Sequence, residues 1–235
     1  MGGFLRFLAF FAVLAAVLVL VVVPLAAGPL LTQMVRDHGV RSSNLAVTVA
    51  LFDPTILFGR SRSMHVSADD VDMSDATIGS LELTLNDISF FDQTWEQVDG
   101  EIRDIRVTTG GQTFVVDTLT VSGPADAANA TVRLSADEIE SLIRFAAERE
   151  GLRIDDVAFS DTGVRVDLAG VQADARLDVR GGALVLVPPS GEGGVALIQP
   201  APSDPWQLSE AWVSDEGLNL RGTVDTTRLV QNVIG

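Results

Sequence analysis

The sequence has no cysteine and no lysine, and both absences narrow what the protein can do. Without cysteine the chain has no disulfide, no thiolate metal site, no thiol nucleophile and no cysteine-linked lipid. All 16 basic residues are arginines, against 32 acidic residues, which gives a net charge of −16. Nucleic acid phosphates and anionic lipid headgroups both attract clustered positive charge. The balance therefore predicts neither nucleic acid binding nor docking through a basic surface.

Recognisable catalytic motifs are also missing. The two histidines, His38 and His65, form no close metal-binding pair, and no G-x-S-x-G elbow, P-loop or dinucleotide-binding motif occurs. The acidic run 69–75 spaces oxygen donors as a calcium loop does. However, Asp75 and Leu81 stand where an EF-hand needs glycine and glutamate. We therefore predict no enzyme activity, no cofactor and no metal, and we interpret the run as a solvated loop.

The longest apolar run lies near the N-terminus. Residues 7–23 contain no polar side chain, and only Pro24 interrupts residues 7–27. A helix over 7–27 would reach about 31 Å, which matches the hydrocarbon core of a bilayer. The run is longer than a usual signal-peptide core and lacks a good cleavage site. We predict an uncleaved, single-pass anchor over residues 1–28, in preference to a removed signal peptide, with the bulk of the chain on the extracytoplasmic side.

Residues 29–235 show the alternation that is typical of β-strands. In the stretch 78–90, Leu81, Leu83 and Leu85 alternate with polar residues, which gives one apolar face. The pattern changes phase near Asn86 and Asp87, as one extra residue in a β-bulge would cause. Further strands are predicted over 46–52, 64–68, 102–107, 114–121, 157–159, 164–168, 171–179, 183–187, 195–198, 206–213 and 218–224.

One strong helix is predicted over residues 136–150. Ser135 and Glu138 form an S-x-x-E capping box before it, and Gly151 ends it. Its apolar stripe comprises Ile139, Leu142, Ile143 and Ala146. The predicted fold class is α+β: an N-terminal transmembrane helix, then a long, curved, mainly antiparallel sheet wrapped around this amphipathic helix. Residues 29–235 form one β-rich domain in this prediction.

Several segments are similar to those of a known family. The segment 51–60 places Phe52 and Pro54 before a Gly-Arg ending, and residues 78–88 form the alternating strand described above. Together with residues 121–124, 135–150 and 218–222, these segments resemble the LmeA-like phospholipid-binding family. The resemblance implies a cell-envelope protein whose curved sheet and helix enclose an apolar groove. It also implies phospholipid binding and a link to envelope lipid or glycolipid metabolism.

The apolar faces of the strands and the helix are the expected lining of such a groove. Periodicity alone does not distinguish a groove from a filled core, because apolar faces normally pack together. The resemblance favours a groove that holds acyl chains, at about 0.8 kcal/mol per CH₂, with no catalytic residue required. The predicted lipid-contacting residues are Phe52, Ile56, Leu57, Phe58, Leu81, Leu83, Leu85, Leu142, Ile143 and Phe145.

A second hypothesis comes from a different class of protein. It is a non-enzymatic envelope scaffold with a filled core, whose acidic surface or strand edges bind a protein partner of unknown identity. An apolar cleft in the structure favours lipid binding, whereas a solid core favours the scaffold. A hydrolase would need a convergent nucleophile, base and oxyanion site, which the sequence does not supply.

Overall fold

The computed structural model describes residues 42–49, 55, 58–73, 76–89, 91–92, 94–109, 112–149, 151, 153–160, 163–168, 171–201, 203–214 and 217–229. The predicted anchor over residues 1–28 lies outside these ranges, as do Phe52, Ile56 and Leu57. Within the described ranges, no helix has both the length and the apolar character needed to cross a bilayer.

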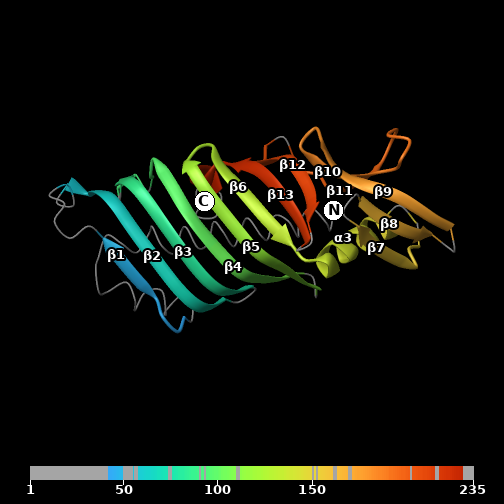
Figure 1. Ribbon diagram of the computed structural model, residues 1–235. Coiled ribbons are helices and arrows are strands. Elements are labelled where there is room, and N and C mark those ends of the chain that lie inside the picture. The colour runs from blue at the N-terminus through green and yellow to red at the C-terminus, as the bar shows by residue number, and fades with distance from the viewer. Residues whose placement is uncertain are drawn as a thin grey trace.

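The larger sheet has eight strands in its described part, and each pair of neighbours is antiparallel (Figure 1). The order is β1-β2-β3-β4-β5-β6-β13-β12, so the last two strands of the chain complete the sheet beside β6. The strands are β1 (Ala46–Val49), β2 (Arg60–Met73), β3 (Ala76–Ser89), β4 (Gln97–Thr109), β5 (Gln112–Pro124), β6 (Ala128–Leu134), β12 (Trp206–Ser214) and β13 (Gly217–Val224).

A smaller antiparallel sheet of five strands lies at the other end of the molecule, in the order β11-β10-β9-β8-β7. Its strands are β7 (Asp156–Ser160), β8 (Gly163–Leu168), β9 (Val171–Arg180), β10 (Ala183–Val187) and β11 (Val195–Ile198). The helix α3 (Ala136–Arg149) connects β6 to β7 and packs against β11 and β13, while β9 lies beside β12. One hydrophobic cluster includes residues of both sheets and of the helix.

These elements confirm a sheet-dominated, antiparallel α+β architecture, but the strands divide into two sheets where one long sheet was predicted. The helix α3 packs mainly against β11 and β13, at the junction of the sheets. The wrapping of the sheet around this helix therefore stays a prediction. Strand β6 was not predicted, although Ala128, Ala130, Val132 and Leu134 alternate regularly and are buried.

The predicted change of phase in β3 is confirmed, but its cause differs. Asp87 has a positive φ of 53°, and Ile88 returns to the buried face. Ser61 of β2 pairs with Ile88. Ser63 pairs with Asn86, so one residue lies between the pairs on each strand. Both strands change phase together and the register is kept, whereas a bulge would add a residue to one strand only.

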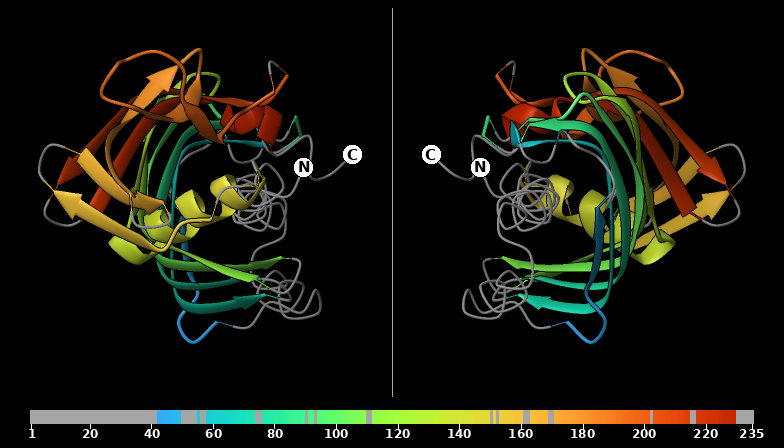
Figure 2. Two further views of the ribbon diagram at one scale, coloured as in Figure 1. Left: turned by 90° about the vertical axis from the view of Figure 1, so that its right-hand side faces the viewer. Right: turned by 90° about the vertical axis from the view of Figure 1, so that its left-hand side faces the viewer.

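A second change of phase forms a row across β2, β3 and β4. Asp70 and Asp104 have positive φ angles of 48° and 52°, and Gly79 lies between them in the sheet. A Cβ on Gly79 would come within 2.8 Å of the Cβ of Asp104, so glycine permits the close approach of these strands. Figure 2 shows the strands of this sheet curving into an open trough.

The helix begins as predicted. The Glu138 N–H donates to the Ser135 hydroxyl at 3.4 Å, and the Ile139 N–H donates to the Ser135 carbonyl at 3.1 Å. The Ser135 side chain is therefore the N-cap of α3. The predicted stripe of Ile139, Leu142, Ile143 and Ala146 is buried at 9% exposure or less. This stripe faces the core. Ala147, which follows Ala146 on the helix, faces the smaller sheet.

Candidate functional site: an apolar pocket beside the helix

An apolar pocket lies between α3 and strands β8 to β11. Its volume is about 290 Å³, close to the lower end of the range of about 300–1,000 Å³ that is usual for small-molecule sites. Apolar side chains make up most of the lining, with Asp174 the one charged residue among them. The lining residues are Ile143, Ala147, Ile154, Val166, Ala173, Asp174, Ala175, Leu186, Pro188, Gly194, Val195 and Leu197.

Small side chains create this volume. Ile143 and Ala147 are one helical turn apart, so both present to the same side of α3. Ala173 and Ala175 are two residues apart in β9, and both line the pocket as side chains on one face of a strand do. Three of these four residues are alanine. Larger side chains would fill the space between α3 and β9, whereas alanine leaves it open. The geometry suits a flexible hydrocarbon chain.

Arg144 fixes one wall of the pocket. Its Nη1 donates to the Ile154 carbonyl at 2.6 Å, and its Nη2 donates to the Asp155 carbonyl at 3.2 Å. Its Nε donates to the Glu140 carboxylate at 2.7 Å, one turn earlier on the helix. The guanidinium therefore ties α3 to the connection that carries Ile154, one of the lining residues.

Arg180 holds the opposite wall in a similar way. Its Nη1 and Nη2 donate to the carbonyls of Gly193 and Gly191 at 3.1 and 3.2 Å. The loop fixed by these bonds ends at Gly194, which lines the pocket with a φ of 139°. A Cβ at this position would come within 2.8 Å of the Leu186 carbonyl oxygen. The loop therefore approaches β10 closely, and the pocket wall depends on a glycine there.

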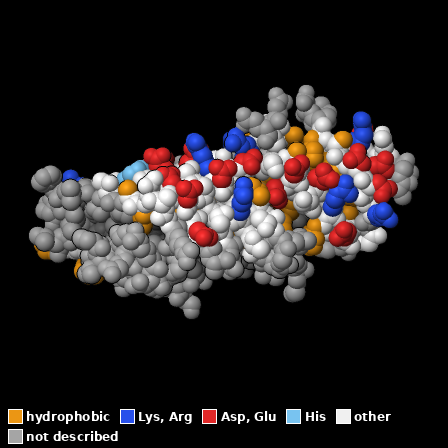
Figure 3. Space-filling view, turned by 90° about the horizontal axis from the view of Figure 1, so that it is seen from below, with side chains coloured by type: hydrophobic (Ala, Val, Ile, Leu, Met, Phe, Trp, Pro, Cys, Tyr) orange, Lys and Arg blue, Asp and Glu red, His pale blue; other side chains and the backbone are white. Residues whose placement is uncertain are grey.

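An exposed ion pair joins two of the strands that form the pocket. The Arg165 Nε donates to the Asp174 carboxylate at 2.9 Å, and both side chains are more than half exposed. Arg165 and Asp174 alternate with Val166, Ala173 and Ala175, which line the pocket, so the ion pair lies on the other face of the smaller sheet. Figure 3 shows acidic and arginine side chains intermixed over one face of the molecule, with hydrophobic side chains between them.

Replacing Arg144 with alanine should lower the free energy of unfolding by about 1–2 kcal/mol, because hydrogen bonds to two carbonyls are lost from a side chain that is one-third exposed. It should also loosen the wall carrying Ile154. Arg153→Ala is the matched control, since that side chain is 91% exposed and its ion pair with Asp155 contributes little. Urea denaturation compares the variants, and equal losses would contradict the role of Arg144.

The predicted lipid-contacting residues fall into three groups. Phe52, Ile56 and Leu57 lie outside the described residues, and the Phe58 side chain is 76% exposed. Leu81, Leu83, Leu85, Leu142 and Ile143 all belong to the buried hydrophobic cluster, and Phe145 is half-buried. Ile143 is the predicted residue that lines the apolar pocket. The other lining residues were not predicted, because the predicted lining consisted of large apolar side chains, whereas small side chains leave the space of this pocket.

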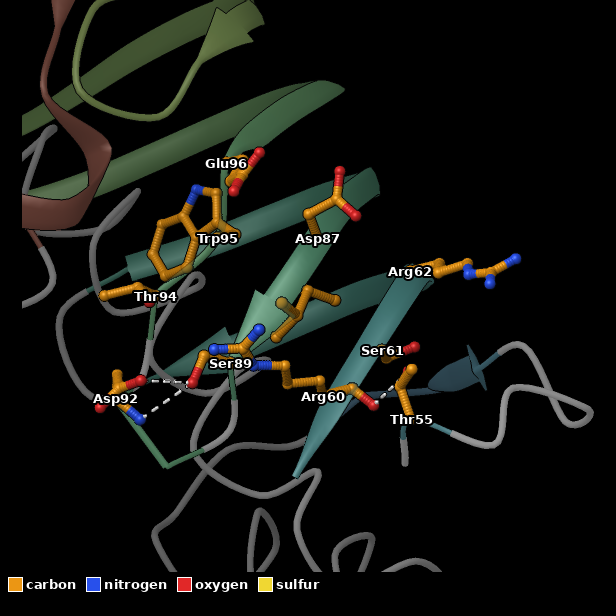
Figure 4. Close-up of a pocket in the computed structure, with 11 residues that line it drawn as sticks. Thr55, Arg60, Ser61, Arg62, Asp87, Ser89, Asp92, Thr94, Trp95 and Glu96 are labelled. Atoms are coloured by element: carbon orange, nitrogen blue, oxygen red, sulfur yellow. Dashed lines mark hydrogen bonds between the residues drawn. The ribbon is translucent and has the colours of Figure 1, made fainter. Parts of the chain in front are cut away.

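A second pocket, of about 380 Å³, is polar and lies where β2, β3 and β4 meet at one end of the larger sheet (Figure 4). Arg60, Arg62, Asp87, Asp92 and Glu96 contribute charges of both signs. Within it the Ser89 hydroxyl donates to the Asp92 carboxylate at 2.6 Å, and the Thr55 hydroxyl donates to the Arg60 carbonyl at 3.3 Å. The first contact lies in the turn that follows β3, and the second lies at the start of β2.

Metal binding finds no support in the part of the chain that is described, since no group of three potential ligand side chains gathers there. His65 lies on β2, where its Nδ1 is 3.1 Å from the Thr84 hydroxyl and its Nε2 is 3.7 Å from the Glu82 carboxylate. His38 lies outside the described residues. The acidic run 69–75 is described only in part, because Ser74 and Asp75 are outside the described ranges.

The curved antiparallel sheet and the helix beside it form a β-rich protein with an apolar pocket. Residues 19–223 match the model of the LmeA-like phospholipid-binding family, so the chain belongs to that family. The resemblance carried by the sequence motifs is thereby confirmed, and phospholipid is the ligand class that the family indicates. No curated protein and no solved structure matches the chain.

Proposed function

We propose that this protein binds a phospholipid by holding acyl chain in the apolar pocket between α3 and the smaller sheet. The observation that supports the proposal is the lining itself, in which apolar side chains from one helix and four strands surround about 290 Å³. Each methylene group moved from water into such a site contributes about 0.8 kcal/mol. The headgroup would remain outside the pocket, in contact with solvent. No step of this function requires a catalytic residue, so we propose a non-enzymatic protein.

We further propose that the chain is anchored in the cell membrane by residues 1–28, with the lipid-binding part on the extracytoplasmic side. The apolar run 7–27 has the length of a bilayer-spanning helix and supports the anchor. The net charge of −16 favours a body that stays away from anionic headgroups unless a specific part of it is adapted to them. A lipid-binding site held beside a membrane would support envelope lipid or glycolipid metabolism by presenting or storing single lipid molecules.

Mass spectrometry of lipid that stays with the full chain through detergent washing tests the proposal. The proposal predicts about one phospholipid per chain, and predicts its loss when the pocket is filled by Ala147→Phe. Because that variant keeps residues 7–27, lipid that adheres to the apolar segment would remain in both samples and can be subtracted. Equal lipid in the two proteins would contradict binding in this pocket and would favour the scaffold hypothesis.

A further inference from the structure

Two exposed phenylalanines stand out at one end of the larger sheet. Phe58 and Phe91 are 76% and 80% exposed, and no other large hydrophobic side chain of the described ranges is exposed. They belong to different connections, since Phe58 precedes β2 and Phe91 follows β3. Arg60 pairs with Ser89, and each phenylalanine lies two residues beyond that pair. The two exposed rings therefore lie at the same end of the same strand pair.

The Phe91 ring lies against the backbone just before β2. Gly59, the residue between Phe58 and β2, has a φ of 69° and lies directly against the Phe91 side chain. The positive φ favours glycine at this position, and a Cβ there would displace the Phe91 ring from the contact. One side of the ring rests on this backbone and the other side faces solvent. We call Phe58, Gly59 and Phe91 the aromatic tip.

The charged groups beside the aromatic tip have both signs, with Arg60 and Arg62 close to Asp87, Asp92 and Glu96. Arg60 and Arg62 follow directly on β2, and both side chains are exposed. Figure 4 shows them on that strand, with Arg60 near Ser89 and Asp92 in the polar pocket. Exposed aromatic rings beside guanidinium groups match the boundary of a bilayer, where rings enter the acyl region and arginines reach phosphates. A protein partner would instead be expected to cover a broader apolar surface.

We propose that the aromatic tip inserts into the surface of a phospholipid bilayer, with Arg60 and Arg62 beside lipid phosphates. This contact is additional to the proposed N-terminal anchor and lies apart from the apolar pocket, with which the polar pocket behind the tip shares no lining residue. The inference takes its lipid class from the proposed function. It can still fail alone, because tip insertion and lipid held in the pocket are separate measurements. Insertion would fix the orientation of the body on the membrane.

A single fluorescent label tests the tip, because the chain has no native cysteine. In the full chain, reconstituted in phosphatidylcholine vesicles, Asp92→Cys places an environment-sensitive dye beside Phe91 and keeps both rings. The matched control is Glu192→Cys, an exposed position in the β10–β11 connection of the smaller sheet. We expect the dye at position 92 to shift to the blue and to be quenched by lipids that carry nitroxide on the acyl chain. The dye at position 192 should show neither effect.

Adding Phe58→Ser and Phe91→Ser to the Asp92→Cys chain separates the rings from the anchor. The proposal predicts that most of the blue shift and quenching disappears, while circular dichroism and retained phospholipid stay unchanged. A dye at position 92 that stays in water on vesicles would overturn the proposal, and so would a shift that survives both serine substitutions. A shift that grows with protein density in the vesicles would assign the tip to a second copy of the chain and would also overturn it.

Discussion

Replacing Ala147 with phenylalanine should weaken phospholipid binding about fiftyfold while leaving the fold intact. The new ring would occupy part of the 290 Å³ between α3 and the smaller sheet. If it excludes about three methylene groups, about 2.4 kcal/mol of binding free energy is lost at about 0.8 kcal/mol each. Every 1.4 kcal/mol changes an affinity about tenfold, which gives the stated loss. Competition against a fluorescent phospholipid on the purified full chain measures it.

The matched control for this prediction is Ala158→Phe. Ala158 is exposed on β7, so the same methyl-to-benzyl change there adds apolar surface outside the pocket. Lipid affinity should stay within twofold of that of the parent chain, which is a change of about 0.4 kcal/mol or less in binding free energy. If both variants lose affinity equally, the effect arises from general perturbation, and the pocket is not the binding site.

Thr226→Val, which keeps the volume of the side chain, should lower the free energy of unfolding by about 2 kcal/mol. Thr226 is fully buried, and its hydroxyl accepts the Trp95 indole N–H at 3.1 Å and donates to the Ala125 carbonyl at 2.8 Å. Valine has the shape of threonine but cannot accept, so the buried indole donor, 131 residues away in sequence, loses this partner. An unsatisfied buried donor costs about 1–3 kcal/mol. Urea denaturation followed by circular dichroism measures the change.

Two further variants assign the loss to the hydrogen bond. Thr226→Ser keeps the hydroxyl and removes one methyl group, so it should cost only about 0.8 kcal/mol. In a chain that already carries Trp95→Phe, Thr226→Val should cost clearly less than in the parent, because no indole donor remains to be stranded. A full, additive loss in the double variant would contradict the account of this contact.

The strand pattern could be predicted from the sequence wherever turns and alternation agree. The strands predicted over 206–213 and 218–224 pair as the hairpin of β12 and β13, and Arg180 and Ala183 pair across the Gly181-Gly182 turn. In these places the turn residues fix the register and the alternation fixes the face. Strand β6 was overlooked because two of its four buried positions are alanines, which carry a weak β signal despite their regular spacing.

The lining of the site was harder to predict because a pocket is a property of several elements together. Leu83 and Leu85 have the alternation expected of a groove, yet both are fully buried within the hydrophobic cluster. The pocket lies where Ala147 meets Ala173 and Ala175, and no periodicity identifies small residues that face one another across two elements. The alternation of β9 was visible in the sequence. The position of Ala147 of α3 opposite β9 follows only from the three-dimensional arrangement.

The aromatic tip shows the same limit for exposed residues. Phe58 was predicted to line a groove because it lies in the segment 51–60 that resembles the family. Its exposure follows from where β2 begins and from the register with β3, which brings Phe91 to the same end. The glycine between them supported the family resemblance as part of a Gly-Arg ending. Its structural role, to accept the Phe91 ring, depends on a contact between residues 32 positions apart.

Photo-crosslinking is the most direct test of where the acyl chain lies. The full chain in lipid nanodiscs would receive a phosphatidylcholine with a diazirine near the end of one acyl chain, and peptide mass spectrometry would locate the adducts. The account predicts adducts on pocket residues such as Ile143, Ile154 and Leu197, and predicts that Ala147→Phe removes them. Adducts confined to residues 7–27, or found on the buried leucines of β3 with the pocket residues unlabelled, would contradict it.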